Sequence, residues 1–460
     1  MDIMEQELIS EKIADSAANA PGRRRKKAHQ RGRHGSPRKR HGTPDRIRHP
    51  LCPQFWSGES KSKLVTAALN KQIEDLDGRL YTLSDASHSF VSDISSANID
   101  VSSGCREPYA SSEMELVETE LNAVKARVGG MPPEDWYRLT NYTDLASALR
   151  YSTKNDPNVE LGTNAWLKFW SILHDFSQLA DVPHGGSTSV HLCEAPGAFV
   201  SALNHFLAVR KPTVHQEWSW LGSSLNPYAS DSKEAIADDR LIKHTLKNWH
   251  FGADNIGDLR LPENQLSLVK AARSHGKKVL LVTADGGIDC SDNPADQELS
   301  LSELKLAEVR TTLSLLDLGG NFVIKMFTFF RKKTCQLVQV LRICFSKVVF
   351  YKPSTSKPGN SEIYVICLGF KGLPAGTTFE FLIKKELEPA LASELTSLAH
   401  KCADHQSVAI RMNLAVFTVD STQRPRRSFH QAKQRFSHRF LTYRPIFALP
   451  NSARLIPMTE

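Results

Sequence analysis

The chain has 460 residues and a formal net charge of +8 at pH 7, but this charge is unevenly placed. Residues 22–49 hold twelve Lys and Arg against one acid, so the rest of the chain is near −3. No apolar stretch reaches transmembrane length, and the acidic first residues do not resemble a signal peptide. We therefore expect a soluble, non-secreted protein without a membrane partner.

The basic segment, residues 22–49, is poor in apolar side chains and rich in Gly, His, Pro and Ser. Such a composition cannot bury a core, which predicts a disordered basic arm. Its Lys and Arg clusters suit a nuclear-import signal or a loose contact with RNA phosphates, and a merely solvated tail is the alternative. The eight cysteines lack metal-ligand spacing, so we expect reduced thiols and no metal site.

Residues 1–107 as a whole are predicted to be mostly disordered, because a stretch rich in Ser, Asp and Asn follows the arm. Residues 108–180 are predicted to form a helical extension, since apolar side chains recur at helical spacing around Leu116 and again from Trp166 to Leu173.

Residues 373–460 are predicted to be an irregular, basic C-terminal region. Aromatic side chains are interleaved with its Lys and Arg, at Phe429, Phe436, Phe440 and Tyr443. Aromatics between basic residues can stack on RNA bases, and a poorly packed tail is the equal alternative.

The central segment, residues 181–372, alternates strand candidates with helical patterns. The strand candidates are Val190–Cys193, Glu217–Leu221, Val279–Asp285, Asn321–Phe327, Lys347–Tyr351 and Glu362–Leu368. Two of these runs are continuously apolar, as in a parallel sheet covered on both faces, so we predict a doubly wound α/β sheet.

Two charged residues stand out in these apolar runs: Lys325 within one and Asp285 at the end of another. A charge in a buried strand is costly unless it is paired or used, so a structural pair and a functional site are both open. The loop Cys193–Phe199 follows the first strand, where ligands bind in such sheets. Its single glycine and its proline argue against a dinucleotide and favour a nucleoside cofactor without phosphates, such as S-adenosylmethionine.

A set of ordered motifs makes the resemblance specific. They are His191–Phe199, Leu225–Tyr228, Thr283–Gly287, Val323–Phe327 and Ser356–Glu362. Together they resemble the FtsJ-type ribose 2′-O-methyltransferases, and most closely the cap-specific mRNA (nucleoside-2′-O-)-methyltransferase 2 family. The resemblance implies a class I S-adenosylmethionine-dependent methyltransferase: a Rossmann-like fold with a mixed seven-stranded sheet whose last strand is antiparallel.

The family's catalytic tetrad falls on Lys168, Asp285, Lys325 and Glu362. Judged without the family, Lys168 reads as a solvated helix lysine and Glu362 as a surface acid at a strand start. An antiparallel last strand would bring Glu362 to the mouth formed by Asp285 and Lys325. The resemblance also implies cofactor contacts at Gly197, Trp218 and Asp285; core packing is the alternative for Trp218.

The chemistry explains why these residue types are needed. A ribose hydroxyl hardly ionises at neutral pH, and a lysine at its ordinary pKa of ~10.4 is a poor base. We expect burial and neighbouring cations to lower the pKa of Lys325, so that it accepts or orients the hydroxyl proton. Lys168 then stabilises the developing alkoxide, and Asp285 positions the ammonium groups and faces the donor.

The resemblance implies methylation of the second transcribed nucleotide of capped mRNA, with capped small nuclear RNA as a further partner, in nucleus and cytoplasm. The alternatives are methylation of the first nucleotide or of tRNA or rRNA, and a non-catalytic RNA-binding protein. Family members usually carry a second, inactive methyltransferase domain. The residues after Phe370 do not match it, so we expect a truncated gene model or a lineage that lost the domain.

Overall fold

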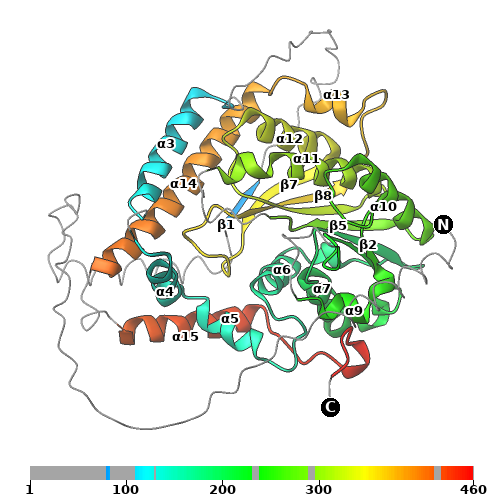
Figure 1. Ribbon diagram of the computed structural model, residues 1–460, viewed down its shortest axis with the longest axis horizontal. Coiled ribbons are helices and arrows are strands. Elements are labelled where there is room, and N and C mark those ends of the chain that lie inside the picture. Colours follow the sequence, from blue (N-terminus) through cyan, green and yellow to red (C-terminus); the bar gives the residue numbers. More distant parts are fainter. Residues whose placement is uncertain are drawn as a thin grey trace. The chain divides into compact units, whose positions relative to one another are not determined.

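The alternating apolar runs form one mixed eight-stranded sheet in the order β1-β7-β8-β6-β5-β2-β3-β4 (Figure 1). Its strands are β1 Arg79–Thr82, β2 Ser187–Leu192, β3 Trp218–Ser223, β4 Trp249–His250, β5 Val279–Ala284, β6 Asn321–Met326, β7 Phe345–Lys352 and β8 Ile363–Phe370. β8 is antiparallel to both of its neighbours, β6 and β7. The predicted seven-stranded α/β fold with an antiparallel last strand is thereby confirmed for β2–β8. β1 adds an unpredicted eighth strand, antiparallel to β7.

This structure is a computed structural model that describes residues 79–82, 109–128, 131–229, 238–287, 296–418 and 426–458. The basic arm and most of the predicted disordered region lie outside these residues. Among the described helices, none is both long and apolar enough to cross a bilayer.

Helices cover both faces of the sheet (Figure 1). The α-helices are α3 Ser112–Ala126, α4 Pro133–Thr143, α5 Ser147–Lys154, α6 Asn164–Asp175, α7 Ala198–Arg210, α8 Pro212–His215, α9 Arg240–His244, α10 Pro262–Ser274, α11 Gln297–Leu315, α12 Lys332–Cys344, α13 Phe379–Ile383, α14 Pro389–Thr418 and α15 Arg426–Tyr443. Short 3₁₀ turns span Ser177–Ala180, Leu246–Asn248 and Asn451–Ala453. One apolar core lies between the sheet and α3, α10, α11, α12 and α14, and a second lies between the sheet and α6, α7 and α15.

Helix α6 is positioned by its N-terminal cap and by contacts of its aromatic side chains. The Thr163 hydroxyl accepts a hydrogen bond from the Trp166 amide, which caps the first turn. Phe169 stacks on Phe199 of α7 with ring centroids 4.2 Å apart, and Trp166 stacks on Trp170 at 4.8 Å. The Phe169–Phe199 contact holds α6 against α7, so a side chain on its remaining face has a defined direction.

The C-terminal region contains long helices and not the irregular structure that we predicted. α14 packs along α3, and α15 packs on α5 (Figure 1). Phe429, Phe436 and Phe440 are buried in the core beneath α15. The hypothesis that aromatic rings of this region stack on RNA bases is therefore wrong for these three, because they are already packed against protein; for Tyr443, which is exposed, it stays a prediction.

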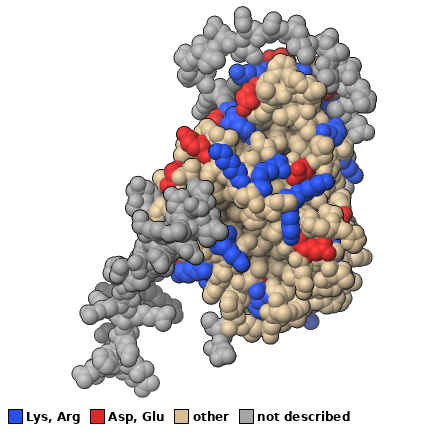
Figure 2. Space-filling view, turned by 90° about the vertical axis from the view of Figure 1, so that its right-hand side faces the viewer, with Lys and Arg blue, Asp and Glu red and all other residues tan. Residues whose placement is uncertain are grey.

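Positive charge is not confined to the arm. Figure 2 shows the side on which α10 lies in Figure 1, where Lys and Arg side chains gather near the middle with few Asp and Glu among them. A net charge near −3 outside the arm thus hides a locally basic face. Such a face attracts polyanions over the range of a Debye length.

Candidate active site

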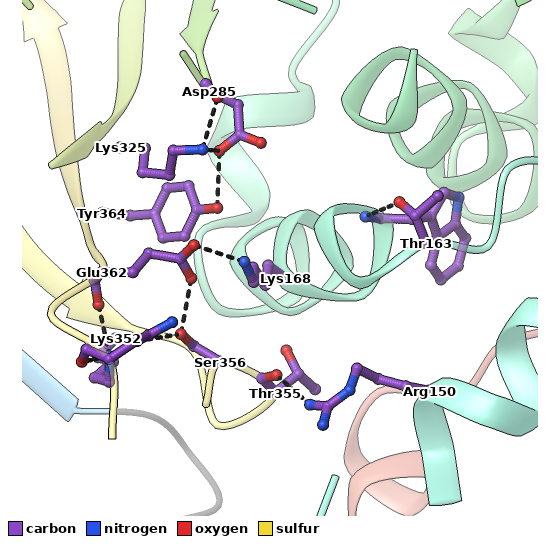
Figure 3. A network of polar contacts seen from close by, with 12 residues as sticks. Arg150, Thr163, Lys168, Asp285, Lys325, Lys352, Thr355, Ser356, Glu362 and Tyr364 are labelled. Carbon is purple, nitrogen blue, oxygen red and sulfur yellow. Dashed lines mark hydrogen bonds and ion pairs between the residues drawn. The ribbon is translucent and has the colours of Figure 1, made fainter. Parts of the chain in front are cut away.

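Four charged side chains meet at the carboxyl edge of the sheet. Asp285 follows β5, Lys325 lies in β6 and Glu362 immediately precedes β8. Because β8 runs antiparallel to β6, its start lies beside the ends of β5 and β6. Lys168 reaches the same edge from α6 (Figure 3). The structure therefore brings together all four residues of the predicted tetrad.

The four residues form two close ion pairs. Lys168 Nζ lies 2.7 Å from Glu362 Oε2, and Lys325 Nζ lies 3.3 Å from Asp285 Oδ1. Lys325 Nζ also donates to the main-chain oxygen of Asp285 at 2.7 Å. All four side chains are at most 17% exposed, so both pairs are largely shielded from water. Charges in such a setting interact more strongly than surface charges do.

Three further residues hold the tetrad and were missed in the sequence. Tyr364 donates its hydroxyl to Asp285 Oδ1 at 3.0 Å, and Ser356 donates to Glu362 Oε1 at 2.7 Å. Lys352 Nζ donates to the main-chain oxygen of Glu362 at 2.7 Å. A sequence signal existed for Tyr364 alone: it stands two residues after Glu362 in a strand, and therefore faces the same side.

The carboxylates and ammonium groups set one another's protonation. Burial acts to raise the pKa of Glu362, but Lys168, Lys325 and Lys352 together lower it to about 2. For Lys325, burial lowers the pKa, yet Asp285 and Glu362 outweigh it and the net shift is upward from 10.5. Our prediction of a lowered Lys325 pKa is therefore wrong for the protein by itself. The acids were counted as positioning groups, whereas they also stabilise the ammonium form.

Glu362 should make the stability of the protein pH-dependent. Its folded-state pKa lies below the unfolded value of ~4.3, so its stabilising effect is complete above that value and is lost as pH falls through about 2. Urea unfolding of the wild type and Glu362→Gln at pH 6 and pH 3 checks this. The difference in unfolding free energy between the wild type and Glu362→Gln should be roughly half as large at pH 3 as at pH 6. An equal difference at the two pH values would contradict the assigned pKa.

A second buried ion pair supports the loop that carries Asp285. Lys305 Nζ lies 2.8 Å from Glu308 Oε2, and both side chains on α11 are almost fully buried. The Gly286 amide donates to Glu308 Oε1 at 3.1 Å, while Lys305 donates to the Gly286 carbonyl at 2.9 Å. The backbone N–H and C=O of Gly286 thus both have a hydrogen-bond partner in this one ion pair. Because Lys325 binds the adjacent Asp285 carbonyl, the pair indirectly sets the position of the Lys325 ammonium.

The loop after β2 is shaped by Glu194. Its buried Oε1 accepts hydrogen bonds from the amides of Phe199 and Val200, which begin α7. Burial, together with the nearby charge of Asp285, raises the pKa of Glu194 to about 8. This acid is therefore a structural cap for the loop, and it adds little negative charge near neutral pH.

At Gly197, which we predicted to contact the cofactor, the structure shows two constraints on the residue type. Its φ is +105°, in the left-handed region, and a Cβ would lie 2.1 Å from Leu241 Cδ2. The glycine is therefore required by backbone conformation and by packing against α9. Approach of a ligand to its backbone remains a prediction.

Replacing Gly197 with alanine should destabilise the protein. We expect a loss of about 1–3 kcal/mol, because alanine is strained at this φ and collides with Leu241. Thermal unfolding measures the loss. Leu241→Ala should therefore cost less stability in the Gly197→Ala background than in the wild type, because it also relieves the collision. An unchanged melting temperature in Gly197→Ala would contradict both reasons.

Trp218 is placed at the wrong end of the sheet for its predicted role. It is the first residue of β3 and pairs with Ser187 at the start of β2. The tetrad lies at the opposite, carboxyl edge, about 16 Å away along a strand of this length. The predicted cofactor contact at Trp218 is therefore wrong; its indole donates to Ser189 Oγ at 2.9 Å.

The residues after β3 are better placed to contact a cofactor. The Ala195 amide donates to Ser224 Oγ at 3.3 Å, which joins the loop after β2 to the loop after β3. Asn226 lies buried in the second loop and donates to the Asn255 carbonyl at 2.8 Å. Its position at a strand end was the signal that we could have used.

These features fit a positively charged nucleoside. The carboxylate of Asp285 lies at the edge of the sheet beside the two joined loops, and an anion there attracts a cofactor that carries a positive charge.

Among the residues that the structure describes, no group of three or more His, Cys, Asp and Glu could hold a metal ion.

Comparisons with known proteins define the class. Residues 162–370 match the family model described as FtsJ-like methyltransferase, and they include the whole tetrad. This part of the chain is an FtsJ-like methyltransferase domain.

The chain is related, more particularly, to proteins named "Cap-specific mRNA (nucleoside-2'-O-)-methyltransferase 2", which confirms the resemblance seen in the motifs. It is 37% identical to the Danio rerio protein over 342 residues, which covers 70% of this chain and 46% of that protein. It is 42% identical to the Pongo abelii protein over 263 residues, covering 56% of this chain and 34% of that protein. The Drosophila melanogaster protein is 39% identical over 267 residues, with 57% and 38% covered. The matched part spans less than half the length of these relatives.

Proposed function

We propose that this protein uses S-adenosylmethionine to methylate the ribose 2′-hydroxyl of the second transcribed nucleotide of capped mRNA. The observation that carries the proposal is the tetrad, assembled as two shielded ion pairs at one mouth of an FtsJ-like domain. The name of the relatives supports capped mRNA as the substrate and the ribose 2′-oxygen as the position that is methylated.

Lys325 acts on the acceptor hydroxyl. S-adenosylmethionine, when bound, supplies an electrophilic methyl group. The raised pKa of Lys325 keeps it protonated near neutral pH, so in the absence of other cations it orients the hydroxyl by donating to its oxygen. Beside the positively charged cofactor the pKa of Lys325 would fall, so that the ammonium can release its proton to solvent before the reaction. The neutral amine can then take the hydroxyl proton as the oxygen attacks the methyl group, and the sulfur leaves as a neutral thioether. Asp285, held by Tyr364, keeps the ammonium group in place.

Lys168 and Glu362 form the other side of the mouth. Their pairing holds the Lys168 ammonium at a fixed position near Lys325 (Figure 3). A fixed cation stabilises negative charge that develops on the ribose oxygen without reorganising during the reaction. Glu362 remains ionised throughout the physiological range, since its pKa is about 2.

Capped small nuclear RNA is a second proposed substrate, and nucleus and cytoplasm are the proposed locations. The predicted arm, residues 22–49, fits nuclear import or a loose phosphate contact by its charge. It lies outside the described residues, so this part of the proposal rests on sequence alone.

The test uses labelled S-adenosylmethionine and short RNAs that differ in cap and in methylation of the first two riboses. We expect transfer to capped RNA, and loss of transfer when the second ribose already carries a 2′-O-methyl group. The Lys325→Met variant is the matched control for contaminating activity. Loss of transfer only when the first ribose is methylated would assign the first nucleotide instead.

Two other outcomes would overturn the proposal further. Equal labelling of uncapped tRNA or rRNA would replace capped mRNA as the substrate. RNA binding with no transfer to any RNA would favour a non-catalytic RNA-binding protein, although a binding module has no need for two shielded lysine–carboxylate pairs at one mouth.

A further inference from the structure

Helix α14 lies beyond residues 162–370, the matched methyltransferase region, yet it binds the segment that carries Glu362. We call residues 353–361, between β7 and β8, the acceptor loop. Gln406 of α14 donates through Nε2 to the Gly359 carbonyl at 3.0 Å and accepts from Ser361 Oγ at 3.0 Å. Its side chain is buried. One glutamine thus uses both ends of its amide to hold the last residues before Glu362.

The rest of the acceptor loop is anchored from the other side. Arg150 of α5 donates to the Thr355 carbonyl at 2.9 Å, and the Lys357 ammonium lies 5.0 Å from the ring centroid of Tyr137 in α4. Within the loop, Ser356 donates to Glu362 Oε1 (Figure 3). The loop is therefore held at its first part by α4 and α5 and at its last part by α14, with Glu362 at the end of the held segment.

Helix α14 also forms a wall of a shallow, open pocket that Glu362 of the tetrad lines. Glu362, Phe327 and Pro358 line one part of this pocket, and α14 contributes Ala399, Cys402, Ala403, His405 and Gln406. Phe327 is two residues after Lys325 in the chain, and its ring centroid is 5.9 Å from the Lys325 Nζ atom. The pocket thus connects the Glu362 carboxylate with α14, and the Phe327 ring lies between the pocket and the Lys325 ammonium.

From these contacts we propose that Gln406 is a positioning residue for the acceptor side of the active site. It fixes Gly359 and Ser361, and through them the place of Glu362 opposite Lys168. Helix α14 then helps to position the residues that face the RNA, although it lies outside the matched methyltransferase region. This inference rests on the proposed function, since it assigns Glu362 to the acceptor ribose.

The test replaces Gln406 with methionine, which keeps the length of the side chain and removes both hydrogen bonds. The control is Leu395→Ala, which loosens the same helix at a buried apolar position about 16 Å away along the axis. We expect Gln406→Met to lower kcat on RNA by about 10- to 100-fold, since a small misplacement of a catalytic group is costly. The Kd of S-adenosylmethionine should stay at the wild-type value, because the donor side of the mouth is untouched.

A merely structural role would give a different pattern. The inference is overturned if Gln406→Met and Leu395→Ala lower kcat equally at a matched loss of melting temperature. It is also overturned if the Kd of S-adenosylmethionine rises in Gln406→Met by as large a factor as kcat falls. If it is right, the pH–rate profile of Gln406→Met moves to lower pH. Displacing Glu362 removes one of the carboxylates that hold the Lys325 pKa up.

Two measurements separate this inference from the proposed function. Amide hydrogen exchange at residues 359–362 should be faster in Gln406→Met than in Leu395→Ala, whether or not any RNA is methylated; equal exchange would overturn the positioning role. A double-mutant cycle with Ser361→Ala should show kcat effects that do not add, because both residues form one link. A wild type inactive on every RNA would defeat the proposed function and leave the exchange result to stand alone.

Discussion

Lys325→Met is expected to lower the rate of methyl transfer by about 10²- to 10⁴-fold, the usual loss when a group that handles the reacting proton is removed. Its Nζ lies between the Asp285 carbonyl and carboxylate at the mouth, where the acceptor hydroxyl has to approach. The Kd of S-adenosylmethionine should change little, because the loops after β2 and β3 are not altered. Single-turnover kinetics with isothermal titration of the donor measure both quantities.

The choice of substitutions separates two roles of this lysine. Lys325→Arg keeps a positive charge but cannot act as a base near neutral pH. Partial activity in Lys325→Arg would indicate charge stabilisation alone, whereas activity as low as that of Lys325→Met would support proton acceptance. Lys347→Met, which changes an exposed lysine on β7 of the same sheet, controls for loss of a surface charge. Normal turnover in Lys325→Met would remove the residue from the mechanism.

Glu308→Leu is expected to cost about 3–5 kcal/mol of unfolding free energy, because it leaves the Lys305 ammonium buried without its carboxylate. It also leaves the Gly286 amide without its acceptor. Urea unfolding at constant pH measures the loss. The double variant Lys305→Met/Glu308→Leu should recover much of it, since an apolar pair of similar size avoids the buried charge.

Activity should not recover together with stability in the double variant. Gly286 loses both of its side-chain partners there, so the Asp285 carbonyl that binds Lys325 is no longer held. We expect kcat to remain low while the melting temperature rises. Stability losses that simply add in the double variant would show that the two side chains do not act as a pair.

The sheet was predictable because its strands are short apolar runs at regular spacing. Each of the six predicted strands overlaps an observed one, and only the two-residue β4 and the polar β1 were missed. A charge inside an apolar run singled out Lys325 and Asp285 on physical grounds alone. Lys168 and Glu362 depended on the family resemblance, because a lysine on a helix and an acid before a strand are common on any surface.

The errors also have identifiable physical causes. Trp218 was assigned by its segment, without asking which end of the parallel strand it occupies. In the C-terminal region, Phe429, Phe436 and Phe440 recur at helical spacing, so an amphipathic helix could have been predicted from them. The roles of Glu308 and Gln406 had no local signal, since the backbone groups that they hold lie 22 or more residues away in the chain.

The anchoring of the acceptor loop has a consequence for biosynthesis. Arg150 and Gln406, which hold its two parts, are separated by most of the folded chain. During translation the sheet can assemble as soon as β8 has emerged, but the loop before Glu362 is secured only after α14 has followed. A nascent chain of which β8 has left the ribosome, but α14 has not, would thus have its strands in place and lack a finished mouth. Completion of this mouth therefore follows the assembly of the sheet.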